Sequence, residues 1–467
     1  MSLIKSISGI RGTIGGDTGD NLTPIDIVKF TAAYVKWLQG QPRNGESLKV
    51  VVGRDARISG ECVMALIVKT LQMCGVNVVN LGLSTTPTVE FAVIYKEAHG
   101  GIIVTASHNP QQWNALKLLN ARGEFLSKLD GEYLLKLAAG TSFTFADVDK
   151  LGKELFDFRL LRRHINAILE LPLVDVEAIA QANLNVVIDN INSVGCMALP
   201  RLLKSLGVTQ ITEINDKMTG RFAHNPEPLP ENLIQLAKEV KAQKADLGIV
   251  VDPDVDRLAF VCEDGSMFGE EYTLVAVADY VLQNTPGNVV SNLSSTRALR
   301  DVAEKVGCAY TAAAVGEVNV VEKMKAVNAV IGGEGNGGVI YPPLHYGRDA
   351  LVGIALFLSH YVKVGKKMTK LRGTYPAYFM SKNKIELDPK TNVDAVLRHI
   401  KERFADEKIT DIDGIKIDFE RKREWVQLRK SNTEAIIRIY AESPKAASAD
   451  QLAQKIMDEI KAFVAKG

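Results

Sequence analysis

The stretch Gly101-Ile102-Ile103-Val104-Thr105-Ala106-Ser107-His108-Asn109-Pro110 decides the fold, because a β-branched run stops at small and polar residues. This run predicts a buried strand over 101–105, then a tight loop and the start of a helix. Ser107 would lie where a strand ends and a helix begins, a place where backbone N–H groups and the helix dipole favour an anion. A hydroxyl there suits phosphate chemistry, although a helix cap followed by an Asn-Pro turn would use the same residues.

Strands and helices alternate on both sides of this stretch. Buried strands are predicted over 49–53 and 76–82, with a helix over 60–73 between them. This alternation predicts βαβ units in a largely parallel sheet, with functional loops at the carboxyl ends of strands. The polar residues 132–163 are predicted to form a helical connection to the next unit.

The pattern then recurs twice along the chain before it changes. The second set of predicted strands covers 185–189, 210–214 and 246–252, and the third covers 258–262, 288–293, 309–313 and 327–332. After about residue 370, predicted strands 377–387, 414–419, 425–429 and 436–440 accompany helices 393–404 and 449–465. We therefore predict three topologically similar α/β domains with mixed, largely parallel sheets and a smaller C-terminal α+β domain around a central cleft, divided as 1–153, 154–256, 257–370 and 371–467.

Length and composition limit the classes of function. The chain has 467 residues, which suits three or four domains at ~100–200 residues each. Its formal net charge is +1, so no overall field recruits nucleic acid or an acidic membrane. The five cysteines contain no C-x-x-C pair, and no apolar run approaches the ~20 residues that span a bilayer. A cytoplasmic protein that holds anionic ligands with local groups is expected.

The motif Asp252-Pro253-Asp254-Val255-Asp256-Arg257 follows a predicted buried strand directly. Three carboxylates at alternate positions can converge on one hard cation such as Mg²⁺, and Arg257 can pair with phosphate. The spacing also resembles an EF-hand loop, but Arg257 occupies the position where that loop needs glycine, and the predicted flanks are strands. A solvated acidic turn is the simpler interpretation of the same residues.

A glycine-rich motif, Gly332-Gly333-Glu334-Gly335-Asn336-Gly337-Gly338, follows another apolar run. It satisfies G-x-G-x-x-G, but Pro342 and Pro343 forbid the helix that a dinucleotide site requires. A tight loop that presents Glu334 and Asn336 suits the recognition of sugar hydroxyls. A purely structural glycine turn is the alternative.

Basic residues mark three further places. The segment 429–434, Arg-Lys-Ser-Asn-Thr-Glu, lies between two predicted strands with Arg438 on the second, and it forms either a phosphate site or a solvated hairpin turn. Arg11 and Lys117 are candidate site residues, although lone basic residues are usually solvated. His108 adjoins Ser107 too closely for an easy triad-like contact, and no G-x-S-x-G is present, so Ser-His-Asp hydrolysis is disfavoured.

Taken together, the four motifs resemble the α-D-phosphohexomutase superfamily over the whole chain and in the same order. The segment 105–110 matches the phosphoserine loop of that family, 252–257 the metal loop, 333–337 the sugar loop and 429–434 the phosphate loop. The resemblance implies that Ser107 carries a phosphoryl group and exchanges it with a hexose or hexosamine phosphate through a sugar bisphosphate. It also implies that Mg²⁺ is held by the phosphoserine and by the three aspartates.

The resemblance assigns two sets of site residues. Those implied for catalysis are Ser107, Arg11, His108, Lys117 and Arg257. Those implied for substrate binding are Gly316, Gly333, Glu334, Asn336, Arg429, Ser431, Asn432, Thr433 and Arg438. Partners would be small molecules, namely the sugar monophosphate and a sugar bisphosphate activator, rather than nucleic acid or membrane.

The sequence departs from the family pattern at Ala435, where proline is frequent, in a shortened amino-terminal motif at 8–12, and in the glycine-rich loop. Asn336 replaces a common serine, and Gly338 replaces a histidine, so His345 is a candidate to take over that residue's role. The form Gly-Glu-Gly-Asn-Gly-Gly most resembles the archaeal-type phosphoglucosamine mutase branch, which implies interconversion of glucosamine 6-phosphate and glucosamine 1-phosphate. Phosphomannomutase/phosphoglucomutase activity is the first alternative. A non-catalytic sugar-phosphate binding protein and a hydrolytic phosphatase are further alternatives.

Overall fold

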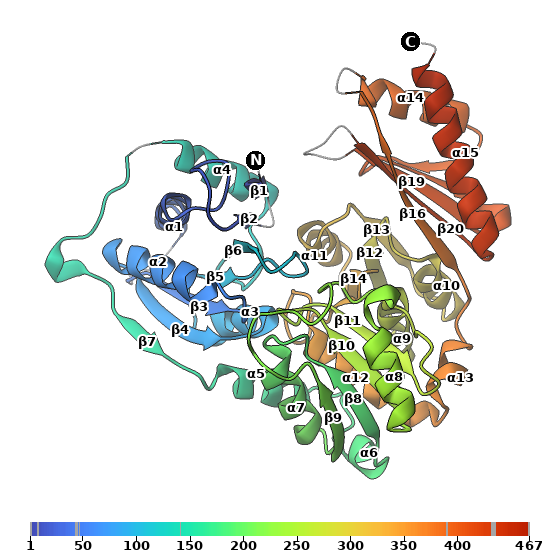
Figure 1. Cartoon of the computed structure of the whole chain (residues 1–467), viewed down its shortest axis with the longest axis horizontal. Coiled ribbons are helices and arrows are strands. Elements are labelled where there is room, and N and C mark those ends of the chain that lie inside the picture. Colours follow the sequence, from blue (N-terminus) through green and yellow to red (C-terminus); the bar gives the residue numbers. More distant parts are fainter. Residues whose placement is uncertain are drawn as a thin grey trace.

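The computed structural model describes residues 2–6, 9–42, 45, 47–140, 142–388, 391–430 and 436–465. These residues form four sheets, and each sheet organises one unit of the chain (Figure 1). The first and fourth units stand at opposite sides of Figure 1, and the third unit lies beside the fourth. The predicted architecture of three α/β units and a smaller C-terminal unit is confirmed.

The first unit is built on a seven-stranded sheet in the order β1-β2-β6-β5-β3-β4-β7. The neighbours β5, β3, β4 and β7 run parallel, and β2 and β6 pair antiparallel. Its strands are β1 (Ile4–Ser6), β2 (Gly9–Thr13), β3 (Lys49–Arg54), β4 (Asn77–Leu83), β5 (Gly100–Val104), β6 (Trp113–Leu119) and β7 (Glu154–Phe156). Its helices are α1 (Pro24–Gln39), α2 (Gly60–Met73), α3 (Thr86–Tyr95) and α4 (Lys128–Ala139).

The second and third units each contain a four-stranded sheet, in the orders β11-β10-β8-β9 and β13-β12-β14-β15. The second comprises β8 (Asn185–Asp189), β9 (Gln210–Ile214), β10 (Leu247–Val251) and β11 (Leu258–Cys262) with α5 (Leu160–Leu169), α6 (Val176–Gln181), α7 (Gly195–Ser205) and α8 (Ile234–Ala242). The third comprises β12 (Asn288–Asn292), β13 (Tyr310–Ala313), β14 (Ala329–Glu334) and β15 (Gly338–Ile340) with α9 (Glu270–Asn284), α10 (Arg297–Lys305), α11 (Glu317–Ala326), α12 (Ala350–Val364) and α13 (Met368–Arg372).

One strand pattern is repeated in all three units. The orders β4-β3-β5-β6, β9-β8-β10-β11 and β13-β12-β14-β15 are equivalent, with three parallel strands followed by one antiparallel strand. The antiparallel strand in each unit is joined to its neighbour by a short hairpin loop. The predicted topological repetition is therefore confirmed, and the three hairpin loops occupy equivalent positions.

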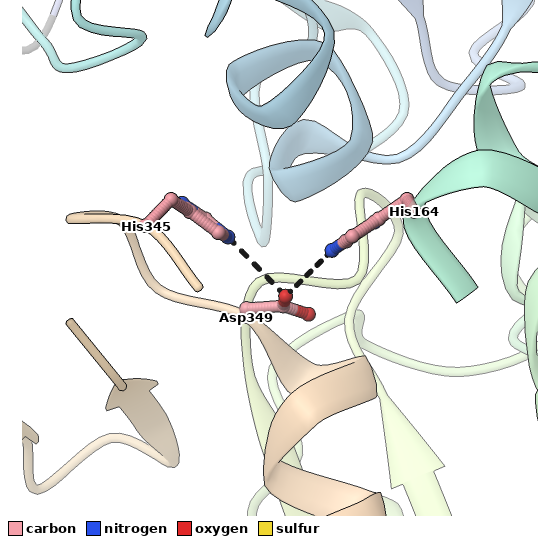
Figure 2. Close-up of side chains that lie close together, drawn as sticks. All are labelled: His164, His345 and Asp349. Atoms are coloured by element: carbon pink, nitrogen blue, oxygen red, sulfur yellow. Dashed lines mark hydrogen bonds and ion pairs between the residues drawn. The ribbon is translucent and has the colours of Figure 1, made fainter. Parts of the chain in front are cut away.

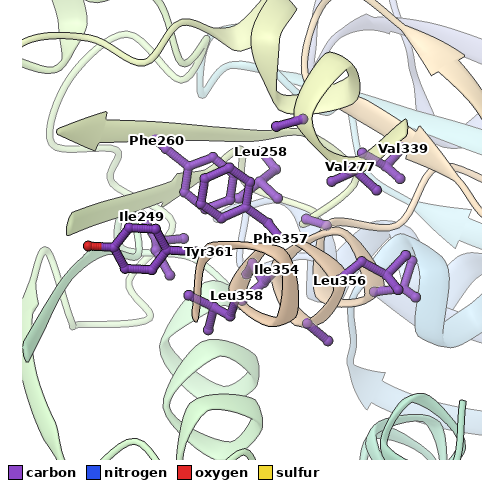
Figure 3. Packing of buried hydrophobic residues seen from close by; sticks show 14 of the residues in the cluster. Ile249, Leu258, Phe260, Val277, Val339, Ile354, Leu356, Phe357, Leu358 and Tyr361 are labelled. Atoms are coloured by element: carbon purple, nitrogen blue, oxygen red, sulfur yellow. The ribbon is translucent and has the colours of Figure 1, made fainter. Parts of the chain in front are cut away.

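A shared hydrophobic core joins the second and third units. Helix α12 is apolar around most of its circumference, as expected of a helix buried on all sides. Phe357 of α12 stacks on Phe260 of β11 with ring centroids 3.8 Å apart, and both are completely buried (Figure 3). Tyr361 and Ile354 extend the contact along the same helix. This packing sets the position of the second unit's hairpin relative to the third.

The fourth unit is an antiparallel sheet with its own core. Its strands are β16 (Phe379–Glu386), β17 (Lys408–Thr410), β18 (Ile415–Phe419), β19 (Glu424–Lys430) and β20 (Ile436–Ser443), and its helices are α14 (Val393–Arg403) and α15 (Ala446–Val464). Polar contacts attach it to the third unit: Glu420 pairs with Arg297 and Arg300 at 2.8 Å each. Among the residues that the structure describes, no helix has the length and apolarity needed to cross a membrane.

Three local predictions are wrong. No helix follows Ser107, because the chain turns back as the antiparallel strand β6. The strand 258–262 belongs to the second sheet rather than the third, since it forms a hairpin with β10 from Leu247↔Cys262 onward. The connection 132–163 is not only helical: β7 within it pairs with β4 at the edge of the first sheet. Strands are recognisable from sequence, but their partners are chosen by packing.

Candidate active site

The three equivalent hairpin loops meet. They are residues 105–112 between β5 and β6, 252–257 between β10 and β11, and 335–337 between β14 and β15. Ser107 Oγ donates to Asp252 Oδ2 at 2.6 Å, which joins the first loop to the second. The N–H of Leu258 donates to the carbonyl of Gly337 at 3.1 Å, which joins the second loop to the third. The topological repeat therefore brings three predicted motifs into one site.

Ser107 is held in a restricted backbone conformation. Its φ of 48° lies in the left-handed region, which non-glycine residues rarely adopt. Its N–H donates to Thr105 Oγ1 at 2.9 Å, and that hydroxyl donates to Asp55 Oδ2 at 2.7 Å. Ser107 is 7% exposed, so its hydroxyl is presented in a nearly closed environment.

Arg57 binds the backbone of the Ser107 loop and was not predicted from the sequence. This arginine is 1% exposed, and its Nε pairs with Asp55 at 3.1 Å. Its two terminal nitrogens donate to four carbonyl oxygens at 2.5 to 3.0 Å, those of Ser107, Asn109, Pro110 and Trp113. A charged donor that satisfies four buried carbonyls fixes the loop strongly. The signal was Arg54-Asp55-Ala56-Arg57, a charged segment that directly follows a buried strand.

The predicted acidic cluster is buried and compact. The carboxylates of Asp252, Asp254 and Asp256 are each 0% exposed and offer ligand atoms within 4.8 Å of one another. Asp252 Oδ1 accepts the backbone N–H groups of Asp256 and Arg257 at 3.1 Å each. The motif is thus not a solvated turn, because its side chains point into the protein.

Cations and hydroxyls surround the acidic cluster. Lys117 Nζ lies 2.7 Å from Asp254 Oδ2 and 3.4 Å from Asp256 Oδ2. Thr86 Oγ1 donates to Asp254 Oδ2 at 2.6 Å. Burial and the two neighbouring aspartates raise the pKa of Asp252. Burial also opposes ionisation of Asp254, but Lys117 and the hydrogen bonds from Asp252 and Thr86 together hold the pKa of Asp254 below its ordinary value.

The cluster fits a hard divalent cation. Oδ1 of Asp254 and Oδ1 of Asp256 are buried, and neither has a hydrogen-bond partner among the described residues. Buried carboxylate oxygens without partners are costly unless a cation balances them. A donor set made only of carboxylate oxygens suits Mg²⁺ better than a thiophilic metal.

His108 lies beside the hydroxyl of Ser107. His108 Nδ1 is 3.5 Å from Ser107 Oγ, at the limit of a hydrogen bond. Burial, followed by the charge of Arg257, lowers the pKa of His108 to about 2, so the ring is neutral and a weak base. This agrees with the expectation that His108 does not form a Ser-His-Asp triad.

Guanidinium groups from three units form a positive region near His108. Burial, then Arg257 of the second unit, then Arg438 of the fourth lower the pKa of Arg11. Nε of Arg11 and Nε of Arg257 are buried without hydrogen-bond partners in the part of the chain that the structure describes. Arg257 Nη1 is paired with Glu227 at 3.2 Å. Three neighbouring guanidinium groups favour an anion such as phosphate.

The glycine-rich loop holds its carboxylate firmly. Glu334 Oε1 accepts Asn292 Nδ2 at 2.7 Å and the N–H of Gly316 at 3.1 Å. Glu334 Oε2 accepts Arg348 Nη1 at 2.9 Å, and Asn336 Nδ2 lies 3.5 Å away. Gly316 therefore positions Glu334 through its backbone. Asn292 is a further residue that was not predicted from the sequence.

Glycines at the loop ends allow close contacts. Gly337 has a φ of 87°, and a Cβ there would overlap the carbonyl of Leu258. A Cβ at Gly333 would overlap the carbonyl of Gly338 across the hairpin. The close approach of two backbones thus requires glycine at these positions.

Arg348 connects the acidic cluster to the glycine-rich loop, and it too was not predicted. Its side chain reaches Asp256 Oδ2 at 2.7 Å, Glu317 Oε2 at 3.1 Å and Glu334 Oε2 at 2.9 Å. These carboxylates outweigh burial and raise the pKa of Arg348, which is therefore charged. A Cβ at Gly338 would overlap Arg348 Cδ, so the arginine fills the space of a side chain at position 338.

His345 does not take that place. Its Nε2 lies 3.2 Å from Asp349 Oδ2 and its Nδ1 3.6 Å from Glu90 Oε2. Both ring nitrogens thus face carboxylates outside the three loops. The expectation that His345 replaces the missing histidine is not supported by these contacts, and Arg348 occupies the space instead.

The predicted phosphate segment is described only in part. Arg429 of β19 pairs with Asp413 at 2.9 Å and lies opposite Arg438 of β20. Asp413, in the turn between β17 and β18, also accepts the N–H of Val315 at 3.0 Å, so it links Arg429 to the third unit. Ser431, Asn432 and Thr433 lie outside the described residues.

Sequence comparison finds all four domain families of one protein family, in order. Residues 3–142, 162–265 and 269–378 match the alpha/beta/alpha domains I, II and III of phosphoglucomutase/phosphomannomutase, and residues 383–459 match its C-terminal domain. The chain is 35% identical to a phosphoglucomutase/phosphomannomutase of Thermococcus kodakarensis, over 96% of this chain and 98% of that protein. It is 30% identical to a phosphoglucosamine/phosphogalactosamine mutase of Sulfurisphaera tokodaii, over 99% of each chain.

Solved structures show the same fold. A phosphoglucomutase/phosphomannomutase family protein of Burkholderia thailandensis superimposes with a TM-score of 0.83 at 24% identity, covering 98% of both chains. An N-acetylphosphoglucosamine mutase of Aspergillus fumigatus, solved with GlcNAc-6P and magnesium, gives a TM-score of 0.60 at 14% identity and covers 98% of this chain and 96% of that one.

Proposed function

The chain belongs to the phosphoglucomutase/phosphomannomutase family of intramolecular phosphotransferases, and within that family we propose that it interconverts glucosamine 6-phosphate and glucosamine 1-phosphate. The observation that carries the proposal is the 2.6 Å contact between Ser107 Oγ and Asp252 where three equivalent loops meet. A phosphate acceptor beside a cation site is what phosphoryl transfer requires. A sugar-binding protein without activity would not need it.

Ser107 is the proposed phosphoryl carrier. In the first half-reaction the bond between phosphorus and Ser107 Oγ breaks, and a bond to the free hydroxyl oxygen of the sugar monophosphate forms. The resulting bisphosphate turns over in the site, and its other phosphoryl group returns to Ser107 Oγ. In each half-reaction the accepting hydroxyl loses one hydrogen and the leaving oxygen gains one, so Ser107 Oγ gains a hydrogen in the first step and the sugar oxygen gains one in the return step. In the resting geometry the hydroxyl of Ser107 is oriented by its hydrogen bond to Asp252 Oδ2. The net result is an isomerisation, and a sugar bisphosphate primes the enzyme.

The acidic cluster and Lys117 are proposed to balance the charge of the transferring group. Asp252, Asp254 and Asp256 would hold Mg²⁺ together with the phosphoserine, and this cation would neutralise charge on the phosphoryl oxygens. Lys117 is protonated because its two aspartate partners outweigh burial and raise its pKa. It therefore stabilises negative charge and does not serve as a base.

Substrate positioning is assigned to the remaining groups. Arg11, Arg257 and Arg438 are proposed to bind phosphate, together with Arg429 and the adjoining segment Ser431, Asn432 and Thr433. Glu334 and Asn336 of the glycine-rich loop, with Gly333 and Gly316 as backbone supports, are proposed to contact sugar hydroxyls. Arg348 keeps Glu334 and Asp256 in register.

The carrier role is tested by mass spectrometry. The protein is incubated with glucose 1,6-bisphosphate and Mg²⁺, and the intact mass and the modified peptide are measured. One phosphoryl group on Ser107, absent from Ser107→Ala, is the expected result. Turnover without phosphorylation of Ser107 would contradict its role as the phosphoryl carrier. Release of inorganic phosphate at the rate of sugar conversion would contradict a mutase and support a hydrolase.

The preference for glucosamine phosphate is supported by the activities of similar proteins and by the glycine-rich motif 333–338. The relative from Sulfurisphaera tokodaii is a phosphoglucosamine/phosphogalactosamine mutase, and one at 32% identity from Pyrococcus abyssi is a probable phosphoglucosamine mutase. The relative at 35% identity supports phosphoglucomutase/phosphomannomutase activity as the second candidate. Coupled assays with glucosamine, N-acetylglucosamine, glucose and mannose 6-phosphates compare kcat/KM directly. Equal or faster turnover of mannose phosphate would establish the second candidate.

A further inference from the structure

A second cluster of potential metal ligands lies outside the three loops. His164 of α5, His345 after β15 and Asp349 before α12 come together from distant parts of the chain (Figure 2). His164 Nε2 lies 3.0 Å and His345 Nε2 lies 3.2 Å from the same oxygen, Asp349 Oδ2. The three side chains are at most 2% exposed. None of them takes part in the phosphoryl chemistry proposed above.

Asp349 has a fixed orientation. Its Oδ1 accepts the N–H groups of Leu351 at 2.8 Å and Val352 at 3.3 Å, so Asp349 is the N-cap of α12. The opposite end of the helix stops at Gly365 in the left-handed conformation, with φ 62°. Because Oδ1 is used by the cap, Oδ2 alone faces the two imidazoles.

Both imidazoles have a polar partner on the ring nitrogen that faces away from Asp349. His164 Nδ1 is 3.1 Å from Thr88 Oγ1, and His345 Nδ1 is 3.6 Å from Glu90 Oε2. Metal-binding histidines usually have a hydrogen bond on one ring nitrogen, which leaves the lone pair of the other available. Thr88 has this role for His164, whereas Glu90 faces His345 as an ion-pair partner without a hydrogen bond. The Nε2 atoms are therefore oriented as a ligand pair.

Glu90 is the independent observation that points to a cation. Its side chain is 1% exposed, and neither carboxylate oxygen has a hydrogen-bond partner among the described residues. A Cβ at Gly347 would overlap Glu90 Oε2, so the carboxylate is confined beside His345. A buried carboxyl group without a hydrogen-bond partner beside His345 is costly unless positive charge lies near it, and a cation bound to the imidazoles would supply that charge.

We propose that His164 Nε2, His345 Nε2 and Asp349 Oδ2 bind a divalent transition metal of the Zn²⁺ class, separate from the Mg²⁺ cluster. Two nitrogens and one oxygen suit Zn²⁺, whereas Mg²⁺ prefers oxygen ligands. The observed spacings of 3.0 and 3.2 Å approach the ~3.3 Å edge of a tetrahedron with bonds of ~2.0 Å. The fourth position would be taken by water.

Such a metal would connect all three α/β units. His164 lies at the start of the second unit, Asp349 and His345 lie in the third, and Thr88 and Glu90 lie on α3 of the first. Helix α3 begins at Thr86, which donates to Asp254 of the acidic cluster. The proposed role is structural. The metal would hold α5 and the start of α12 together, and the ligand histidines would contact α3 through Thr88 and Glu90.

The test measures metal binding directly. Metal-free protein is titrated with Co²⁺ and followed by visible absorption, and Zn²⁺ is then added in competition. We expect one equivalent of Co²⁺ that Zn²⁺ displaces and excess Mg²⁺ does not, and we expect Zn²⁺ to raise the Tm. Asp254→Asn, which alters only the acidic cluster, should retain this equivalent. His345→Gln should lose it and should lose the Zn²⁺-dependent rise in Tm.

Each alternative outcome overturns the proposal. Absence of a tight Co²⁺ equivalent in the unaltered protein would mean that these atoms form a hydrogen-bonded network only. Unchanged binding in His345→Gln, or loss of binding in Asp254→Asn, would place the metal elsewhere. X-ray absorption at the zinc edge of the unaltered protein identifies the ligands even if the variant fails to fold, because two imidazole ligands are expected and a shell of oxygens alone would contradict the site.

Discussion

Two buried clusters of potential metal ligands differ in how the chain builds them. Asp252, Asp254 and Asp256 are near neighbours in one hairpin loop, whereas His164 and Asp349 are 185 positions apart. The first cluster faces Ser107 and Lys117, and two of its carboxylate oxygens have no partner among the described residues. In the second cluster, Asp349 caps the N-terminus of α12, and the ring of His164 is oriented by a contact between its Nδ1 and Thr88.

This difference indicates that the acidic cluster takes part in the reaction, whereas the histidine cluster holds parts of the chain together. The acidic cluster lies beside a hydroxyl and a cation, so its oxygens can act on a bound phosphate. The histidine cluster joins the second and third units, contacts α3 of the first through Thr88 and Glu90, and contacts no group that we assign to the reaction. We therefore expect changes at the first cluster to reduce turnover with little effect on stability, and changes at the second to act mainly on stability and metal content.

The largest effect on turnover is expected for Ser107→Ala. Loss of the phosphoryl acceptor removes the covalent step, and kcat should fall by at least about 10⁴-fold. The Tm should change by less than about 3 °C, since the serine backbone contacts remain. Steady-state assays and thermal unfolding measure both quantities. A variant with a few percent of the original turnover would show that the acidic cluster acts without a phosphoserine.

Removal of the divalent cation should have the next largest effect. With EDTA and no added Mg²⁺, kcat should fall by more than about 10²-fold, because Lys117 and Arg348 alone would not offset the repulsion between three buried carboxylates and the phosphate. Added Mg²⁺ should restore it. Asp254→Asn serves as the matched variant, with reduced turnover that excess Mg²⁺ does not restore. Full activity in EDTA would remove the basis for assigning the acidic cluster to catalysis.

Arg348→Lys tests the connection between the acidic cluster and the glycine-rich loop. A lysine keeps the charge but cannot reach three carboxylates at once, and we expect kcat/KM to fall by about 10- to 100-fold. Arg122→Lys is the control, because that side chain is 71% exposed and makes a surface ion pair. A change of turnover no larger than in the control would show that Arg348 is needed only for folding.

The smallest expected effect is the pH dependence caused by His108. Its pKa in the folded protein is about 2, well below the ~6.5 of an unfolded chain, because burial and Arg257 disfavour the charged ring. Below pH ~6.5 the unfolded state binds more protons, so stability decreases as pH falls, by at most about 1.4 kcal/mol per pH unit from this group. The free energy of unfolding, measured with urea at several values between pH 5 and 7, should change less steeply with pH in His108→Asn than in the unaltered protein. Identical slopes would mean that His108 is protonated in the folded protein.

The predictions from sequence succeeded where one short segment contains the whole signal. The strand 185–189 and the helix 60–73 have the bounds that the pattern predicted, because hydrophobic periodicity is a local property. The acidic motif and the glycine-rich loop were likewise recognised, since their ligands and glycines are contiguous. The prolines after the loop correctly excluded a helix directly after it, since β15 follows instead.

The local sequence pattern could not predict which strands pair with each other or which distant groups a side chain contacts. Strand 258–262 was recognised as a strand but assigned to the wrong sheet, and the chain after Ser107 forms a strand where a helix was expected. Arg57 and Arg348 look like ordinary charged residues in the sequence, and only the folded chain shows that one binds four carbonyls and the other three carboxylates.

The amino-acid sequence alone therefore specified most of the strands, the repeated α/β pattern and the polar residues that each loop contains, because these depend on residues close together in the chain. Folding in three dimensions specified which loops meet, that Arg348 fills the space beside Gly338, and that His164, His345 and Asp349 share one oxygen atom. The reason is physical: burial removes side chains from water and forces each buried charge to find a partner, wherever in the chain that partner lies.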